Sequence, residues 1–96
     1  MTKITVKSDK KIDILPLVSS AIEREANIIY FGIKRTKKNL EHFEKRHKIK
    51  TGIFYRKFQQ GKMGDSMDFI EWAGEYEILQ NLLREYGELR EAKVCS

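Results

Sequence analysis

The sequence predicts an all-α protein that folds as an elongated antiparallel helical hairpin with a short helix at its turn. Apolar residues recur at spacings of three and four over two long segments, which is the period of one face of an α-helix. Gly61 and Gly64 lie between the segments and permit a turn with positive φ. As a helix, the first segment would be about 50 Å long, whereas a compact domain of 96 residues is only about 35 Å across. The two helices are therefore expected to lie side by side.

The first long helix is predicted over residues 14–47. Asp13 suits the N-cap, and Pro16 then falls in the first turn, where its missing N–H removes no intrahelical hydrogen bond. Residues 1–12 are expected to form an extended arm, because residues 3–7 alternate like a brief strand but have no partner strand. The side chains on the buried stripe of this helix are predicted to be Leu15, Val18, Ile22, Ala26, Ile29, Ile33, Thr36, Leu40, Phe43 and His47.

Two further helices are predicted on either side of the glycine junction. We expect the short helix over residues 52–60, with Thr51 as its cap. The last helix is expected over residues 65–92, with Asp65 as its cap, and no proline interrupts it. Its buried stripe is predicted to consist of Phe69, Trp72, Tyr76, Leu79, Leu83 and Tyr86.

The formal net charge of +5 conceals an uneven distribution. Residues 1–63 carry 16 Lys and Arg against 6 Asp and Glu, whereas residues 64–96 carry 3 against 8. Opposite halves of one chain can satisfy each other when they fold together, so the first interpretation is charge complementarity within the hairpin. The antiparallel arrangement should bring together two cations and two carboxylates, which are Arg35, Arg46, Asp68 and Glu71.

The hairpin has more apolar surface than one chain can bury. Two antiparallel helices cover only the strip that each turns to the other, and both predicted helices carry a second apolar stripe. A second copy of the chain is the first choice to cover it, which gives a homodimer in the form of a four-helix bundle, and a different protein is the alternative. The predicted dimer interface consists of Ile14, Leu17, Ile28, Ile78, Leu82 and Leu89.

The residue types do not favour an enzyme, a cofactor or a metal site. The carboxylates from Asp65 onward have simpler explanations as a helix cap and ion-pair partners, and His42 and His47 are five residues apart, a spacing that does not align two imidazoles on one helical face. Cys95 is the only cysteine, so no internal disulfide is expected. No apolar run reaches the roughly 20 residues that cross a bilayer, and the amino terminus lacks an apolar signal core, so we expect a cytoplasmic protein with no membrane partner.

A basic face on the first helix supports an alternative function. Arg35, Lys38 and Arg46 could bind nucleic acid, because clustered cations on a helix release phosphate counterions. These cations lie within one long helix and not in a short helix-turn-helix unit, so base-specific recognition is not expected.

The junction and the start of the last helix resemble a known family. The residues that carry the resemblance are Phe54, Phe58, Gly61, Gly64, Asp65, Asp68, Glu71 and Trp72. This pattern, followed by a leucine-rich helix, is similar to that of small helical antitoxin-like proteins of TumE-type toxin–antitoxin pairs, and the likeness covers about 40 residues, from Thr51 to Glu91. It implies a non-enzymatic protein that binds and masks a partner, its cognate toxin. The residues predicted to contact that partner are Asp65, Asp68, Glu71 and Trp72, together with Glu75 of the same acidic stripe. Trp72 also lies on the predicted buried stripe, so a core position is the competing interpretation.

Overall fold

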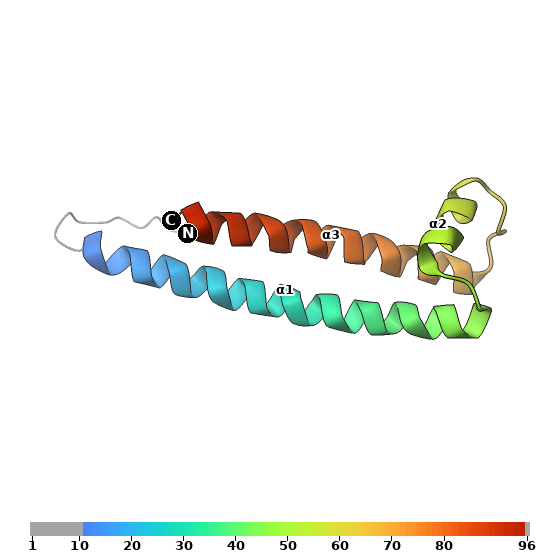
Figure 1. Ribbon diagram of the computed structural model, residues 1–96, viewed down its shortest axis with the longest axis horizontal. Helices are drawn as coiled ribbons and strands as arrows, with labels where there is room; N and C mark the ends of the chain where they lie inside the picture. The colour runs from blue at the N-terminus through green and yellow to red at the C-terminus, as the bar shows by residue number, and fades with distance from the viewer. Residues whose placement is uncertain (1–10, 96) are drawn as a thin grey trace.

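A computed structural model describes the backbone of residues 11–95 and the side chains of residues 15–92. The chain forms three helices, α1 (Lys11–His47), α2 (Thr51–Gln59) and α3 (Met67–Cys95). The two long helices lie side by side and antiparallel, and α2 folds against the start of α3 at one end, the tip of the hairpin (Figure 1). The molecule measures 61 × 21 × 20 Å. The predicted all-α hairpin with a short helix at its turn is confirmed.

The helix ends lie within three residues of those predicted, and three predicted caps are wrong. Because α1 begins at Lys11, Asp13 lies inside this helix and Pro16 lies beyond its first turn. The hydroxyl Oγ of Ser66 accepts a hydrogen bond from the backbone N–H of Phe69 at 3.2 Å, so Ser66 and not Asp65 caps α3. Thr51 is the first residue of α2 and does not cap it. The predicted arm falls on residues 1–10, which lie outside the described part of the chain, and on residues 11 and 12, which belong to α1.

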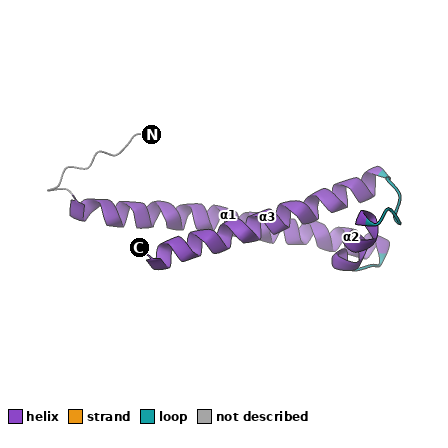
Figure 2. Ribbon diagram, turned by 90° about the horizontal axis from the view of Figure 1, so that it is seen from above, coloured by secondary structure: helices purple, strands orange, loops and turns teal. Residues whose placement is uncertain are grey.

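The interface between α1 and α3 follows a heptad pattern. The inward-facing residues of each helix are spaced alternately by four and three, which favours a left-handed supercoil, and Figure 2 shows the two helices crossing. On α1 these residues are Ile22, Ala26, Ile29, Ile33, Thr36, Leu40, Phe43 and His47, and on α3 they are Trp72, Glu75, Leu79, Leu82, Tyr86 and Leu89. The packed interface is the core of the molecule.

The α3 stripe deviates from the prediction at one leucine. Leu83 was predicted to be buried but is 41% exposed, whereas Leu82 packs against the core. A straight helix with 3.6 residues per turn drifts by about 20° per heptad relative to a 3.5-residue repeat. The supercoil removes this drift, so the row of inward-facing residues on α3, which we call its seam, continues from Leu79 to Leu82 and on to Tyr86.

The inward-facing residue Thr36 of α1 is polar. The hydroxyl of Thr36, which is buried, donates a hydrogen bond to the carbonyl oxygen of Gly32 at 2.8 Å. Beside this position, Gly32 faces α3: Leu82 Cδ1 lies 3.4 Å from the position that a Cβ of residue 32 would take, which is an ordinary van der Waals contact. A Cβ would therefore fit at residue 32, and glycine there weakens the helix by about 1 kcal/mol relative to alanine.

The turn at the tip depends on residues in the left-handed region. Gly61 and Gly64 have φ angles of 76° and 81°, which confirms the predicted positive φ at both positions. Lys48, between α1 and α2, also has a positive φ of 58° and donates its backbone N–H to the carbonyl oxygen of Glu44. None of the helices in the described residues combines the length and the apolar character needed to span a bilayer.

At the end of the hairpin opposite the tip, α1 extends beyond α3. Ala26 and Leu89 line one groove there, so they lie at the same level. Six residues beyond Leu89, α3 ends at Cys95, which is level with residue 20 of α1 (26 − 6). Leu15 and Val18, which were predicted to be buried, are exposed because α1 continues past the end of α3.

Replacing a buried residue of the interface between α1 and α3 should destabilise the protein, whereas replacing an exposed residue should not. We expect Leu40→Ala to lower the free energy of unfolding by about 2–5 kcal/mol, because it leaves a cavity between α1 and α3. The control Lys38→Ala, on the exposed side of the same helix, should change it by less than about 0.5 kcal/mol. Urea denaturation followed by circular dichroism measures both, and equal effects would contradict the assigned seam.

Candidate partner-binding site

A stack of aromatic rings fixes the tip of the hairpin. Trp72 of α3 is 0% exposed and lies parallel to Phe54 of α2, with ring centroids 3.8 Å apart and an interplanar angle of 2°. It also stacks with Phe43 and His47 of α1, at 5.6 Å and 5.3 Å. Its burial removes Trp72 from the predicted partner contacts and makes it the residue around which the three helices meet.

A buried hydrogen-bond chain passes through the same point. The indole Nε1–H of Trp72 donates to the hydroxyl Oγ1 of Thr51 at 3.1 Å. That hydroxyl donates to a carboxylate oxygen of Glu44 at 2.7 Å, and the backbone N–H of Thr51 donates to the same oxygen at 2.9 Å. Glu44, from the preceding helix, therefore satisfies the first N–H of α2, the role that sequence analysis gave to Thr51.

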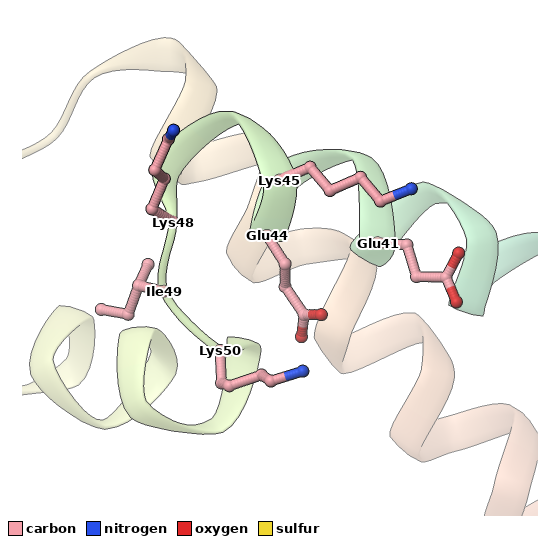
Figure 3. Close-up of a pocket in the computed structure, with 6 residues that line it drawn as sticks. All are labelled: Glu41, Glu44, Lys45, Lys48, Ile49 and Lys50. Atoms are coloured by element: carbon pink, nitrogen blue, oxygen red, sulfur yellow. The ribbon is translucent and has the colours of Figure 1, made fainter.

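The charge of Glu44 is favoured by these contacts. Burial raises the pKa of this carboxyl, but the two hydrogen bonds from Thr51 and the positive charge of Lys50 outweigh it and lower the pKa of Glu44. Figure 3 shows this carboxylate in a groove of about 460 Å³ between the end of α1 and the start of α2. The groove is lined by Glu41, Glu44, Lys45, Lys48, Ile49 and Lys50.

A second electrostatic contact joins α1 to the first turn of α3. Arg46 Nη1 donates to both carboxylate oxygens of Asp68, at 2.8 and 3.0 Å, and His47 Nε2 donates to the same carboxylate. The hydrogen bond from His47, followed by the contact with Arg46, lowers the pKa of Asp68. The prediction that Arg46 lies near Asp68 is confirmed, whereas Arg35 and Glu71, which were predicted to join them, take no part in this contact.

The other acidic residues that were predicted to contact a partner are either hydrogen-bonded within the chain or exposed. Glu75 accepts a hydrogen bond from the Asn39 amide at 3.2 Å and is half-buried. Nearby on α3, Glu77 accepts a hydrogen bond from the Tyr55 hydroxyl at 2.6 Å, which raises the pKa of Tyr55. Asp65 and Glu71 are exposed, and no side-chain hydrogen bond engages them within the described part of the chain. These two carboxylates are therefore available to a partner.

An apolar surface lies beside Glu71 on the outside of α3. We define the α3 outer face by five residues whose directions fall within an arc of about 100° at 100° per residue: Met67, Ile70, Glu71, Gly74 and Ile78. All three apolar side chains of this face are among the exposed large hydrophobics of the molecule. Apart from the adjoining backbone of α3 and the two neighbouring residues, no atom lies within 4 Å of the position that a Cβ of Gly74 would take, so a partner can approach the backbone there. Met67 and Ile70 were not predicted to lie at a partner surface, although their helical spacing from Gly74 and Ile78 indicates a shared face.

The predicted dimer residues do not form one surface. Leu82 and Leu89 pack against the core of their own chain, so they are not part of an exposed patch. Leu17, Ile28 and Ile78 are exposed. The side chain of Ile14 lies outside the described residues. Phe31, which sequence analysis did not assign, is one of the most exposed large apolar side chains.

The residues predicted for nucleic acid and metal have different surroundings. Arg35 and Lys38 are exposed, whereas the guanidinium of Arg46 is held by Asp68. Within residues that the structure describes, no group of three His, Cys, Asp or Glu side chains is arranged to hold a metal ion. Cys95 is the last residue of α3, and its side chain is outside the described set.

Comparison of the chain with protein-family models, with curated proteins and with solved structures gave no match. The candidate site therefore depends on the geometry of these residues alone.

The Thr51 hydroxyl should be needed for the stability of the tip. We expect Thr51→Val to lower the free energy of unfolding by about 1–3 kcal/mol, because it leaves the buried indole N–H of Trp72 without an acceptor. Thr51→Ser keeps the hydroxyl and should lose only about 0.8 kcal/mol for one methyl group. Urea titrations of both variants measure the difference, and a valine variant as stable as the serine variant would contradict the role of the hydrogen-bond chain.

The Asp68 contact predicts a pH dependence of stability. The ordinary pKa of this carboxyl is 3.8, and its pKa in the folded chain is lower. Between the two values the unfolded chain binds more protons, so the stabilisation by Asp68 is complete above about pH 4 and is lost as pH falls through the folded pKa.

Wild type should therefore be more stable than Asp68→Asn at pH 7, and the difference should shrink below about pH 4. Glu71→Gln, at an exposed carboxylate of the same helix, is the matched control and should show little difference at either pH. Thermal unfolding at several pH values provides the measurement. A difference between wild type and Asp68→Asn that stays constant down to pH 2 would exclude the contact as its source.

Proposed function

We propose that this chain is a non-enzymatic interaction module of the antitoxin-like kind, which binds and masks a partner protein through the α3 outer face. The observation that supports this most directly is the group of exposed apolar side chains on that face, beside carboxylates that no group of the described chain neutralises. Isolated apolar residues on a surface are ordinary, but a contiguous set bordered by charge is typical of an interaction site.

The surface is mounted on a rigid support. The core of the tip lies directly behind it, because Trp72 is stacked against Phe54 and Phe43. The hydrogen bonds from Arg46 Nη1 to both carboxylate oxygens of Asp68 join the first turn of α3 to α1. A face that is already ordered loses little conformational entropy on binding, which favours affinity.

The chemistry of the face specifies the kind of partner. Met67, Ile70 and Ile78 would pack against apolar side chains, and Gly74 leaves room for one of them to reach the α3 backbone. Glu71 and Asp65 would lie opposite Lys or Arg on the partner. An amphipathic helix with a basic border fulfils both conditions, and a helix laid along another is a common recognition mode.

The two carboxylates whose pKa values are shifted support a binding role over catalysis. Glu44 and Asp68 both have lowered pKa values, and each is held by hydrogen bonds that join one helix to the next. Their perturbation is explained by structural contacts. A general acid or base needs a pKa moved toward neutral pH, and both of these are moved away from it.

Nucleic-acid binding is the competing function. Arg35 and Lys38 are exposed and would contribute to it, but Arg46, the third residue of the predicted face, already neutralises Asp68. The salt dependence of the binding affinity distinguishes the two functions. Binding to phosphates weakens steeply between low and moderate salt, whereas a mainly apolar interface responds little.

The proposed function is tested by co-purification with the product of the adjacent gene. We expect the two proteins to form a complex at moderate salt. Ile78→Glu should weaken it at least about tenfold, because a charge then lies within the apolar face.

The matched control is Leu83→Glu, which places the same charge at an exposed apolar residue on a different side of α3. This variant should bind normally. Glu71→Lys should also weaken the complex, and Glu41→Lys on α1 should not. If the adjacent product does not bind, or if the Ile78 and Leu83 variants behave alike, this face is not the site.

A further inference from the structure

The outward side of α1 carries a second seam. We define the α1 outer seam as Leu17, Ala21, Arg24, Ile28, Phe31 and Arg35, which are spaced by four, three, four, three and four. All six are exposed, and the three large apolar members, Leu17, Ile28 and Phe31, are 64%, 65% and 64% exposed. Its spacing is the same as that of the buried seam that packs against α3. A helix with two such seams is suited to contact two helices at once.

The position of this seam leaves it open to a partner. At 100° per residue, its members point about 120° around α1 from the buried residues such as Ile29 and Leu40. Neither α2 nor α3 covers that direction, since α2 packs at the tip and α3 lies on the buried side. The seam ends at Arg35, twelve residues before α1 ends at His47 near the tip.

We propose that a second copy of the chain occupies this seam, with the two α1 helices antiparallel and related by a two-fold axis near residue 26. An antiparallel coiled coil pairs each a position with a d position of the other helix. For the α1 outer seam, every such pair of residue numbers adds to 52. The small Ala21 then lies opposite the large Phe31 of the second copy, and Arg24 lies opposite Ile28.

The size pattern favours this self-pairing. Phe31 is too large to face itself across a close helix pair without separating the helices, whereas Ala21 leaves space for it. The two-fold axis repeats the match, so each dimer contains two pairs of Ala21 with Phe31. Small residues opposite large ones are how packed layers interdigitate.

The charge pattern favours the antiparallel direction. A parallel pair in register would stack Arg24 on Arg24 and Arg35 on Arg35, which is repulsive in a partly desolvated interface. In the antiparallel pair, Arg24 faces Ile28 and Arg35 faces Leu17 at the end of the contact. The long alkyl part of each arginine can cover the apolar neighbour while the guanidinium reaches water.

The oligomeric state of the full chain tests the proposal. Light scattering after size exclusion at about 0.1 mM, where even a micromolar association is nearly complete, should give the mass of two chains. Phe31→Glu and Ile28→Lys should each give the mass of one chain, with wild-type helix content by circular dichroism. Ile78→Glu, on the α3 outer face, should remain a dimer, which separates this test from that of the proposed function.

A disulfide experiment tests the direction. In a Cys95→Ser background, Arg24→Cys mixed with Ile28→Cys should form a disulfide-linked heterodimer under mild oxidation, faster than either variant alone. A parallel pair would instead give fast Arg24→Cys homodimers. A wild-type monomer at 0.1 mM, a dimer that survives both seam substitutions, or the parallel cross-linking result would each overturn the proposal.

Discussion

The structure depends on the burial of one side chain, Trp72. Its ring lies 3.8 Å from Phe54 of α2 and also stacks against Phe43 of α1, so a single residue of α3 contacts both other helices. Its N–H is satisfied by Thr51, whose hydroxyl is in turn held by Glu44. A large aromatic residue gains much from burial, but only where its polar atom finds a partner. The tip therefore requires the stack and the hydrogen-bond chain together, and the long helices extend from it as a hairpin.

The period of the apolar residues was sufficient to predict the two long helices, their antiparallel packing and most of the core. It could not separate Leu82 from Leu83, because the choice depends on supercoiling, which appears only when a second helix is present. The caps failed for a related reason. Thr51 and Asp65 are good capping residues in isolation, but Glu44 arrives from another helix and Ser66 lies one position closer to α3.

The candidate site was predictable only as a region. Charge complementarity correctly placed Arg46 near Asp68, since that inference needed only the antiparallel order of two helices. Trp72 was predicted as a partner contact from the family resemblance, but its position on the predicted buried stripe already indicated a core residue, and it is fully buried. Phe31 was missed because it belongs to a seam that no part of the described chain covers. Exposure of a regular seam is a property of the folded molecule, and a sequence period alone does not tell which of two stripes faces inward.

The two proposed surfaces can be occupied together because they lie on different segments along the hairpin. Phe43 stacks on Trp72, so these residues are level, and numbers on the two helices at one level add to 115. The α3 outer face, from Met67 to Ile78, is then level with residues 48 to 37 of α1, whereas the α1 outer seam covers residues 17 to 35. A dimer built on α1 with its axis near residue 26 would point the two tips in opposite directions. Each tip would keep its acidic and apolar face free, so one dimer could bind two copies of a partner at separate ends.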